Sequence, residues 1–95
     1  MEKLVHVDGE KKGDIVIFAL STCGWCKKTK KLLSDLGIEY RYVDFDLIPE
    51  SEIEDAQAEL IRWNPRGSFP TIIINEKDCI VGFDEEKIRL KLGCQ

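Results

Sequence analysis

The stretch Asp14–Leu36, DIVIFALSTCGWCKKTKKLLSDL, decides the fold of this chain. Its first part, Ile15–Leu20, is an apolar run rich in β-branched residues, which predicts a buried strand. The tetrapeptide Cys23-Gly24-Trp25-Cys26 follows after two polar residues. The lysine-rich remainder has helical periodicity, and Gly37 stands where a helix commonly ends. A C-x-x-C pair is therefore expected where a strand passes into a helix.

This placement of the two cysteines predicts thiol chemistry. A thiol reacts as its thiolate, and the free N–H groups and dipole at a helix N-terminus favour an anion there. We therefore expect Cys23 to be the attacking nucleophile. Cys26, one helical turn further on, is expected to resolve the mixed disulfide. The ammonium groups of Lys27 and Lys28 would further stabilise the Cys23 thiolate.

The composition indicates one globular domain with a modest core. The chain has 95 residues, of which 43% are hydrophobic and 34% charged. No apolar run approaches the ~20 residues of a membrane span, and residues 1–8 lack the apolar core of a signal peptide. We expect a cytoplasmic protein that does not bind membranes. The net charge of −4 also gives little support to nucleic-acid binding.

The four cysteines favour redox chemistry over a structural role. A disulfide scaffold needs a secretory context, and a zinc site usually needs a second short-spaced ligand pair. Cys79 and Cys94 are isolated, and His6 is the only histidine. We therefore expect no metal, with His6 as a surface side chain. Cys79 is expected to be a small buried hydrophobe among strand residues, whereas nothing assigns a role to Cys94.

The residues after the first helix continue an alternation of strands and helices. Ile38–Asp46 alternates in polarity and predicts a strand, so the first three elements make a βαβ unit with a parallel pair. Pro49 and the pattern Ser51-x-x-Glu54 predict a capped second helix, whose apolar stripe Trp63 completes.

The last third predicts a hairpin followed by a helix. Its expected parts are a loop up to Pro70, a strand at residues 71–74, a turn at 75–78, a strand at 79–81, and a helix at 85–92 capped by Asp84. The order β-α-β-α-β-β-α predicts an α/β fold with a central mixed four-stranded sheet flanked by helices. Residues 14–95 would form this domain. Residues 1–13 would be an N-terminal extension or an extra edge strand around Leu4–Val7.

Three motifs, taken in this order and spacing, resemble the glutaredoxin branch of the thioredoxin superfamily. They are Cys23-Gly24-Trp25-Cys26, Ser68-Phe69-Pro70 and Gly82-Phe83-Asp84. The resemblance covers roughly residues 14 to 93. It implies a thioredoxin-like fold and a dithiol–disulfide oxidoreductase that needs no metal or organic cofactor.

The resemblance also implies a partner groove beside the cysteines. Pro70 would follow a cis peptide bond and pack against the two cysteines, and the backbone of Phe69 would pair with an extended peptide or with glutathione. The groove residues would be Ser68, Phe69, Pro70, Gly82, Phe83 and Asp84. Trp25 is expected to be exposed at the helix tip and to contact the partner.

Two departures from the glutathione-using members imply a different electron donor. Leu20 stands three positions before the first cysteine, where those members have a basic residue. Gly82-Phe83 stands where they commonly have Gly-Gly, although Asp84 matches the aspartate that holds the glutathione amine. Gly-Phe at this site resembles the NrdH-type redoxins, which reduce ribonucleotide reductase with electrons from a flavin-containing thioredoxin reductase. The resemblance thus implies protein disulfides as substrates and an external reductase as donor.

Two alternatives remain within the same family. One is a conventional glutaredoxin that takes electrons from glutathione. The other follows from Gly24, because some glutaredoxins with glycine after the first cysteine bind a 2Fe–2S cluster across a dimer, using that cysteine and two glutathiones. The second cysteine, Cys26, and the weak glutathione features argue against cluster binding. We therefore expect a monomeric oxidoreductase.

Overall fold

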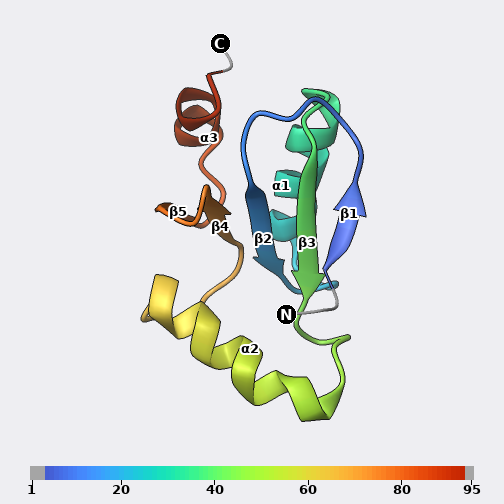
Figure 1. Ribbon diagram of the computed structural model, residues 1–95, viewed down its shortest axis with the longest axis vertical. Helices are drawn as coiled ribbons and strands as arrows, with labels where there is room; N and C mark the ends of the chain where they lie inside the picture. Colours follow the sequence, from blue (N-terminus) through green and yellow to red (C-terminus); the bar gives the residue numbers. More distant parts are fainter. Residues whose placement is uncertain (1–3, 94–95) are drawn as a thin grey trace.

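The computed structural model describes residues 4–93. Within this range five strands and three helices follow one another (Figure 1). Their bounds are β1 (Val5–Val7), β2 (Ile15–Ala19), α1 (Gly24–Asp35), β3 (Tyr40–Asp44), α2 (Glu50–Trp63), β4 (Thr71–Ile74), β5 (Asp78–Val81) and α3 (Glu85–Lys91). Cys94 lies outside the described residues.

The strands form one mixed sheet in the order β1-β3-β2-β4-β5. The central pair, β2 and β3, is parallel, and each of the other neighbouring pairs is antiparallel. The predicted α/β fold with a mixed sheet and a βαβ unit is therefore confirmed. The segment near the N-terminus adds the extra edge strand, β1, which pairs with β3.

The core is divided by the sheet into two clusters of buried side chains. Successive residues of a strand point to opposite faces, so Ile17 and Ala19 join one cluster and Phe18 joins the other. The first cluster takes Leu33 from α1 and Ile88 from α3, whereas α2 contributes its residues to the second. The sheet is thus covered by α1 and α3 on one face and by α2 on the other. Figure 1 shows α1 behind β2 and β3.

The pairing register brings three chain segments that are distant in sequence together at one end of the strands. Phe18 lies opposite Thr71, and Thr71 lies opposite Val81. On the other side of β2, Ala19 pairs with Asp44. The residues just beyond these positions belong to the three motifs that the sequence analysis singled out. The fold therefore assembles them at one place.

Three predicted boundaries are wrong, for local reasons. The first concerns α2, which begins at Glu50 with Pro49 as the N-cap residue and no side-chain cap hydrogen bond. Ser51 is already inside the helix, so it cannot form the predicted capping box with Glu54. The acidic residues of the first turn, Glu50 and Glu52, still suit the helix dipole.

The other two corrections concern strand ends. Strand β3 begins at Tyr40 and ends at Asp44, because the following residues turn toward the loop after β2. The turn of the β4–β5 hairpin is residues 75–77, in which Asn75 and Glu76 have positive φ, so Asp78 is the first residue of β5. No helix within residues 4–93 is long and apolar enough to cross a bilayer.

The connection between β1 and β2 lies tightly against the connection between α1 and β3. Glu10 N–H donates to Gly37 O at 2.6 Å, and Glu39 N–H donates to Glu10 O at 2.9 Å. A Cβ atom on Gly9 would lie 2.6 Å from both Glu39 N and Ile38 C. These neighbours are backbone atoms that hydrogen bonds hold in place, so only glycine fits there.

This contact predicts opposite effects for the same substitution at two glycines. Gly9→Ala forces the two connections apart and is expected to lower the free energy of unfolding by about 1–3 kcal/mol. Gly24→Ala meets no atom within 4 Å and should raise it by up to about 1 kcal/mol, because alanine reduces the freedom of the unfolded chain. Urea unfolding of both variants checks this. Equal effects at the two positions would contradict the close approach at Gly9.

Candidate active site

The first cysteine caps the helix that carries the second. Cys23 is the N-cap residue of α1, with extended backbone angles, and its Sγ accepts a hydrogen bond from Cys26 N–H at 3.2 Å. The sulfur thus takes the position that a serine or aspartate oxygen takes in other helix caps. An N–H donor and the positive end of the helix dipole therefore both face this atom. The predicted location of Cys23 at the helix N-terminus is confirmed.

The two sulfurs have opposite environments. Cys23 is half-buried, whereas Cys26 is fully buried in the core cluster under α1. Burial, followed by the hydrogen bond with Cys23, raises the pKa of the Cys26 thiol to about 12. At neutral pH Cys26 is therefore protonated and shielded. Cys23 is the thiol that an incoming molecule can reach.

The lysines of α1 divide into outer and inner positions. Lys27 and Lys28 are exposed, and Lys28 Nζ lies 4.6 Å from the centroid of the Trp25 ring. Their electrostatic support of the Cys23 thiolate stays a prediction. Lys30, which the sequence analysis did not single out, is half-buried and its Nζ lies 2.9 Å from Asp44 Oδ1. The available signal was its position four residues after Cys26, which places both on one helical face.

A small apolar groove opens beside the cysteines. Its lining residues are Trp25, Phe69, Pro70, Gly82 and Phe83, and its volume is about 230 Å³. The Trp25 and Phe83 rings are stacked, with centroids 5.9 Å apart. The Phe69–Pro70 peptide bond is cis, as the resemblance implied. Trp25 is 57% exposed, which confirms its predicted exposure.

Two predicted groove residues, Ser68 and Asp84, do not line this cavity. Asp84 caps α3 by accepting a hydrogen bond from Lys87 N–H at 3.1 Å. The hydroxyl of Ser68 accepts a hydrogen bond from Asn64 Nδ2 at 3.0 Å. A binding role for either side chain stays a prediction.

Asn64 is a supporting residue that the sequence analysis missed. Its side chain is almost fully buried, and Nδ2 donates to Ser68 and to Thr71 Oγ1, which flank the cis peptide bond on either side. Its Oδ1 accepts from Arg66 N–H at 3.2 Å. A buried amide must satisfy its hydrogen bonds within the protein. Asn64 therefore fixes the backbone that presents Phe69 and Pro70.

A second missed residue, Asp46, tethers the loop before Cys23. Its carboxylate accepts hydrogen bonds from the Ser21 hydroxyl and from Ser21 N–H, the latter at 2.9 Å. Nearby, Phe45 N–H donates to Ala19 O at 2.8 Å. The Ser21 hydroxyl, followed by its N–H, holds the pKa of the Asp46 carboxyl below its usual value. The loops that follow β2 and β3 are thereby joined next to the cysteines.

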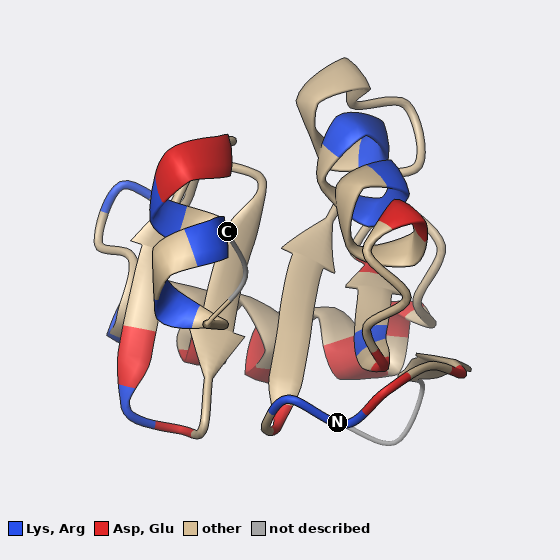
Figure 2. Cartoon of the chain, turned by 90° about the horizontal axis from the view of Figure 1, so that it is seen from above, with Lys and Arg blue, Asp and Glu red and all other residues tan. Residues whose placement is uncertain are grey.

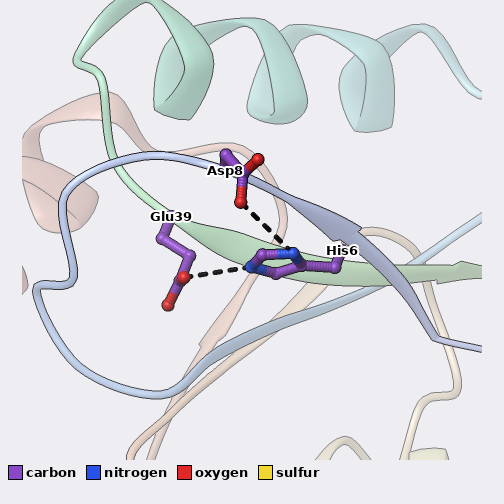
Figure 3. Close-up of side chains that lie close together, drawn as sticks. All are labelled: His6, Asp8 and Glu39. Carbon is purple, nitrogen blue, oxygen red and sulfur yellow. Dashed lines mark hydrogen bonds and ion pairs between the residues drawn. The ribbon is translucent and has the colours of Figure 1, made fainter.

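The sole histidine lies away from this groove, on β1. His6 Nε2 is 3.0 Å from Glu39 Oε2, and His6 Nδ1 is 3.5 Å from Asp8 Oδ1 (Figure 3). Each ring nitrogen thus faces its own carboxylate, whereas a metal ion takes one imidazole nitrogen. His6 and Asp8 are exposed and Glu39 is partly buried, and His6 is paired with each of the two carboxylates. This arrangement agrees with the prediction of a surface side chain.

Cys79 has the environment of a partly buried strand residue. It lies on β5 and is less buried than the sequence analysis predicted. Burial raises the pKa of its thiol, which disfavours the reactive form. Cys79 does not line the groove beside Cys23.

The comparisons with known proteins agree with this geometry. Residues 15–79 match the family model described as Glutaredoxin. This chain belongs to the glutaredoxin family. The glutaredoxin of Ricinus communis is 33% identical over 63 residues, which are 66% of this chain and 60% of that protein. The chain thus spans about 60% of the length of that curated relative.

Two solved structures from Methanosarcina species are more similar. The glutaredoxin from Methanosarcina mazei Go1 is 50% identical with a TM-score of 0.88, and the match covers 97% of this chain and 89% of that one. The methanoredoxin of Methanosarcina acetivorans is 53% identical with a TM-score of 0.86, and the match covers 90% of each chain. The family inferred from the three motifs is therefore confirmed, whereas the likeness to NrdH-type redoxins stays a prediction.

The contrast between the two sulfurs predicts selective alkylation. In the fully reduced protein at pH 7, iodoacetamide is expected to modify Cys23 much faster than Cys26, because Cys26 is buried and protonated. Peptide mapping by mass spectrometry after short exposure measures the two rates. In Cys23→Ser, Cys26 should remain unmodified over the same time. Equal labelling of the two cysteines would show that their environments do not differ in this way.

The tether at Asp46 predicts a pH-dependent contribution to stability. A lowered carboxyl pKa stabilises the folded state above the unfolded pKa, and this contribution disappears as pH falls through the folded pKa. Asp46→Asn should therefore be less stable than wild type at pH 7, and the two unfolding curves should converge as pH falls below about 4. In Ser21→Ala, the same Asp46→Asn change should have a smaller effect at pH 7. A difference that persists undiminished below the folded pKa would contradict this role.

Proposed function

We propose that this chain is a thiol–disulfide oxidoreductase that reduces protein disulfides. Cys23 is the nucleophile and Cys26 is the resolving thiol. The observation that carries the proposal is a pair of unlike sulfurs beside a groove that can hold a substrate. The Cys23 sulfur caps α1 and is accessible, whereas the Cys26 sulfur, three residues later, is buried. Membership of the glutaredoxin family, whose members are thiol oxidoreductases, supports it.

The reaction takes two exchanges. The Cys23 thiolate attacks one sulfur of the substrate disulfide, and the electron pair of the broken bond leaves on the other substrate sulfur, which takes a proton. The Cys26 thiolate then attacks the Cys23 sulfur and displaces the second substrate thiol. The protein is left with a Cys23–Cys26 disulfide. Two electrons and two protons from an external donor restore the dithiol.

The chemistry of the groove favours a peptide substrate over glutathione. Its five lining residues are apolar or glycine, and none carries a charge. Leu20, where the glutathione-using members have a basic residue, is partly buried and packs against the core cluster that contains Phe18. Glutathione carries two carboxylates, for which cations are the natural partners. We therefore assign the groove to the extended backbone and an apolar side chain of a protein substrate.

The surface charge suits such a partner. Helix α1, which begins at the cysteines, carries the exposed Lys27 and Lys28, while α2 carries all five acidic residues between positions 50 and 59 (Figure 2). A partner with acidic residues around its disulfide would be attracted to the α1 side. We propose a monomer in the cytoplasm, reduced by a thioredoxin-type reductase, with ribonucleotide reductase among the candidate substrates.

An insulin-reduction assay with two separate electron supplies tests the proposal. Under anaerobic conditions, one reaction receives NADPH with thioredoxin reductase and the other receives glutathione with its reductase. Turnover is expected with the first supply. It should be abolished in Cys23→Ser, and Cys26→Ser should accumulate a mixed disulfide that mass spectrometry detects. Cys79→Ser, which changes a thiol outside the groove, is the matched control and should retain wild-type turnover.

The other outcomes have definite meanings. Turnover with glutathione alone would show that the apolar groove and Leu20 misidentify the donor and that the chain is a conventional glutaredoxin. Failure with both supplies, together with visible absorbance of the anaerobically purified protein, would favour the cluster-binding alternative. Full activity of Cys23→Ser would overturn the assignment of the nucleophile.

A further inference from the structure

The second exchange poses a problem that the first does not. Cys26 must react as a thiolate, but it is fully buried, and burial raises the pKa of its thiol to about 12. A buried anion needs a compensating charge or hydrogen-bond donor close by. The N–H of Cys26 itself is directed to Cys23 Sγ. A hydrogen bond with the Leu20 backbone lowers this pKa in part, and a nearby positive charge lowers it further.

Lys30 is placed to provide this charge. It follows Cys26 by four residues on α1, so the two side chains project from the same face of the helix. The Lys30 side chain is only 19% exposed, and its Nζ lies 2.9 Å from Asp44 Oδ1 and 3.9 Å from the centroid of the Tyr42 ring. The carboxylate and the ring both hold the ammonium in place. A lysine side chain that is so little exposed is usually paired with a charge, as Lys30 is with Asp44.

The other charges on α1 are differently placed. Lys27 and Lys28 are exposed, and Lys31 forms its ion pair with Asp35 at the surface, where its side chain is 74% exposed. Among the described residues, the ionisable side chains that act on the Cys26 thiol are Cys23, which raises its pKa, and Lys30, which lowers it. Lys30 thus opposes part of the burial effect.

We propose that Lys30 is a positioning residue for the second exchange, whose charge stabilises the Cys26 thiolate as it attacks the Cys23 mixed disulfide. The inference rests on the proposed function and extends it to a residue outside the groove. Asp44 and Tyr42 hold the partly buried ammonium, where the field of a charge is less screened than at a fully exposed position. In the step itself, Cys26 gives up its proton and the Cys23–Cys26 bond forms as the bond between Cys23 and the substrate sulfur breaks. The substrate sulfur departs with the electron pair and takes a proton.

The two exchanges can be followed separately with one equivalent of 5,5′-dithiobis(2-nitrobenzoate). Attack by Cys23 releases the first coloured thiolate, and attack by Cys26 releases the second. Stopped-flow absorbance therefore resolves both exchanges, and their pH dependence gives a midpoint for each. Cys79 and Cys94 are replaced by serine in every variant, so that only the two active-site thiols react. Cys26→Ser identifies the second phase by abolishing it.

Four variants test the role of the charge. Lys30→Met is expected to raise the pH midpoint of the second phase and to slow this phase about tenfold at pH 7, as a one-unit shift would. Its first phase should stay within about twofold of wild type. Lys30→Arg keeps the charge and should restore the midpoint. Lys31→Met makes the same change at the exposed position and should leave both phases unchanged.

Asp44→Asn distinguishes an effect of the Lys30 charge from a structural effect of losing the Lys30–Asp44 ion pair. It breaks the same ion pair but leaves the ammonium uncompensated, so it should not raise the midpoint of the second phase. If the ion pair served only to hold the fold together, Lys30→Met and Asp44→Asn would raise the midpoint alike, and the inference would be overturned. An unchanged midpoint in Lys30→Met would overturn it as well. Absence of the first phase in wild type would instead refute the proposed function itself.

Discussion

Strand β2 is the constraint on which the active site depends. It pairs with a strand on each side and is covered by a core cluster on each face, so it is enclosed along its whole length. The chain becomes free to turn only where β2 ends, after Ala19. Bonds to Phe45 and Asp46 from the next loop then direct the chain into α1. The position of Cys23 is thus a consequence of core packing, and a rigid core gives the first sulfur a fixed location.

The spacing of the two cysteines gives their sulfurs different chemical surroundings. A helix turns by one full turn in 3.6 residues, so the residue three positions after the cap returns to the inner face while its N–H points back toward the cap. One short segment thereby gives Cys23 a donor and buries Cys26. The same burial that protects the second sulfur disfavours its thiolate. A nearby cation would favour this thiolate, and Lys30 on α1, held by Asp44, is the residue to which we assign that role.

The features that the sequence predicted correctly are those that neighbouring residues determine. An apolar β-branched run followed by C-x-x-C and a lysine-rich amphipathic segment defines a strand, a turn and a helix without reference to the rest of the chain. The features it missed depend on distant partners. Lys30 and Lys31 are adjacent and chemically identical, and the helical period alone separates their faces, but only the structure shows that Lys30 meets Asp44 and Tyr42 on β3. Likewise, the buried role of Asn64 depends on the loop that follows it, and that of Asp46 on Ser21.

The groove shows how the register of strand pairing brings together residues that are far apart in the sequence. Its lining comes from the start of α1, from the residues before β4 and from those after β5, which lie far apart in the sequence. They meet because Phe18, Thr71 and Val81 are paired across three adjacent strands. A shift of one residue in either pairing would turn the side chains of a whole strand to the opposite face of the sheet, and Trp25 would lose its stack with Phe83. The three isoleucines of β4 pack on both faces, so the residue of this strand that distinguishes its register is Thr71, which is hydrogen-bonded to Asn64 and Ser68.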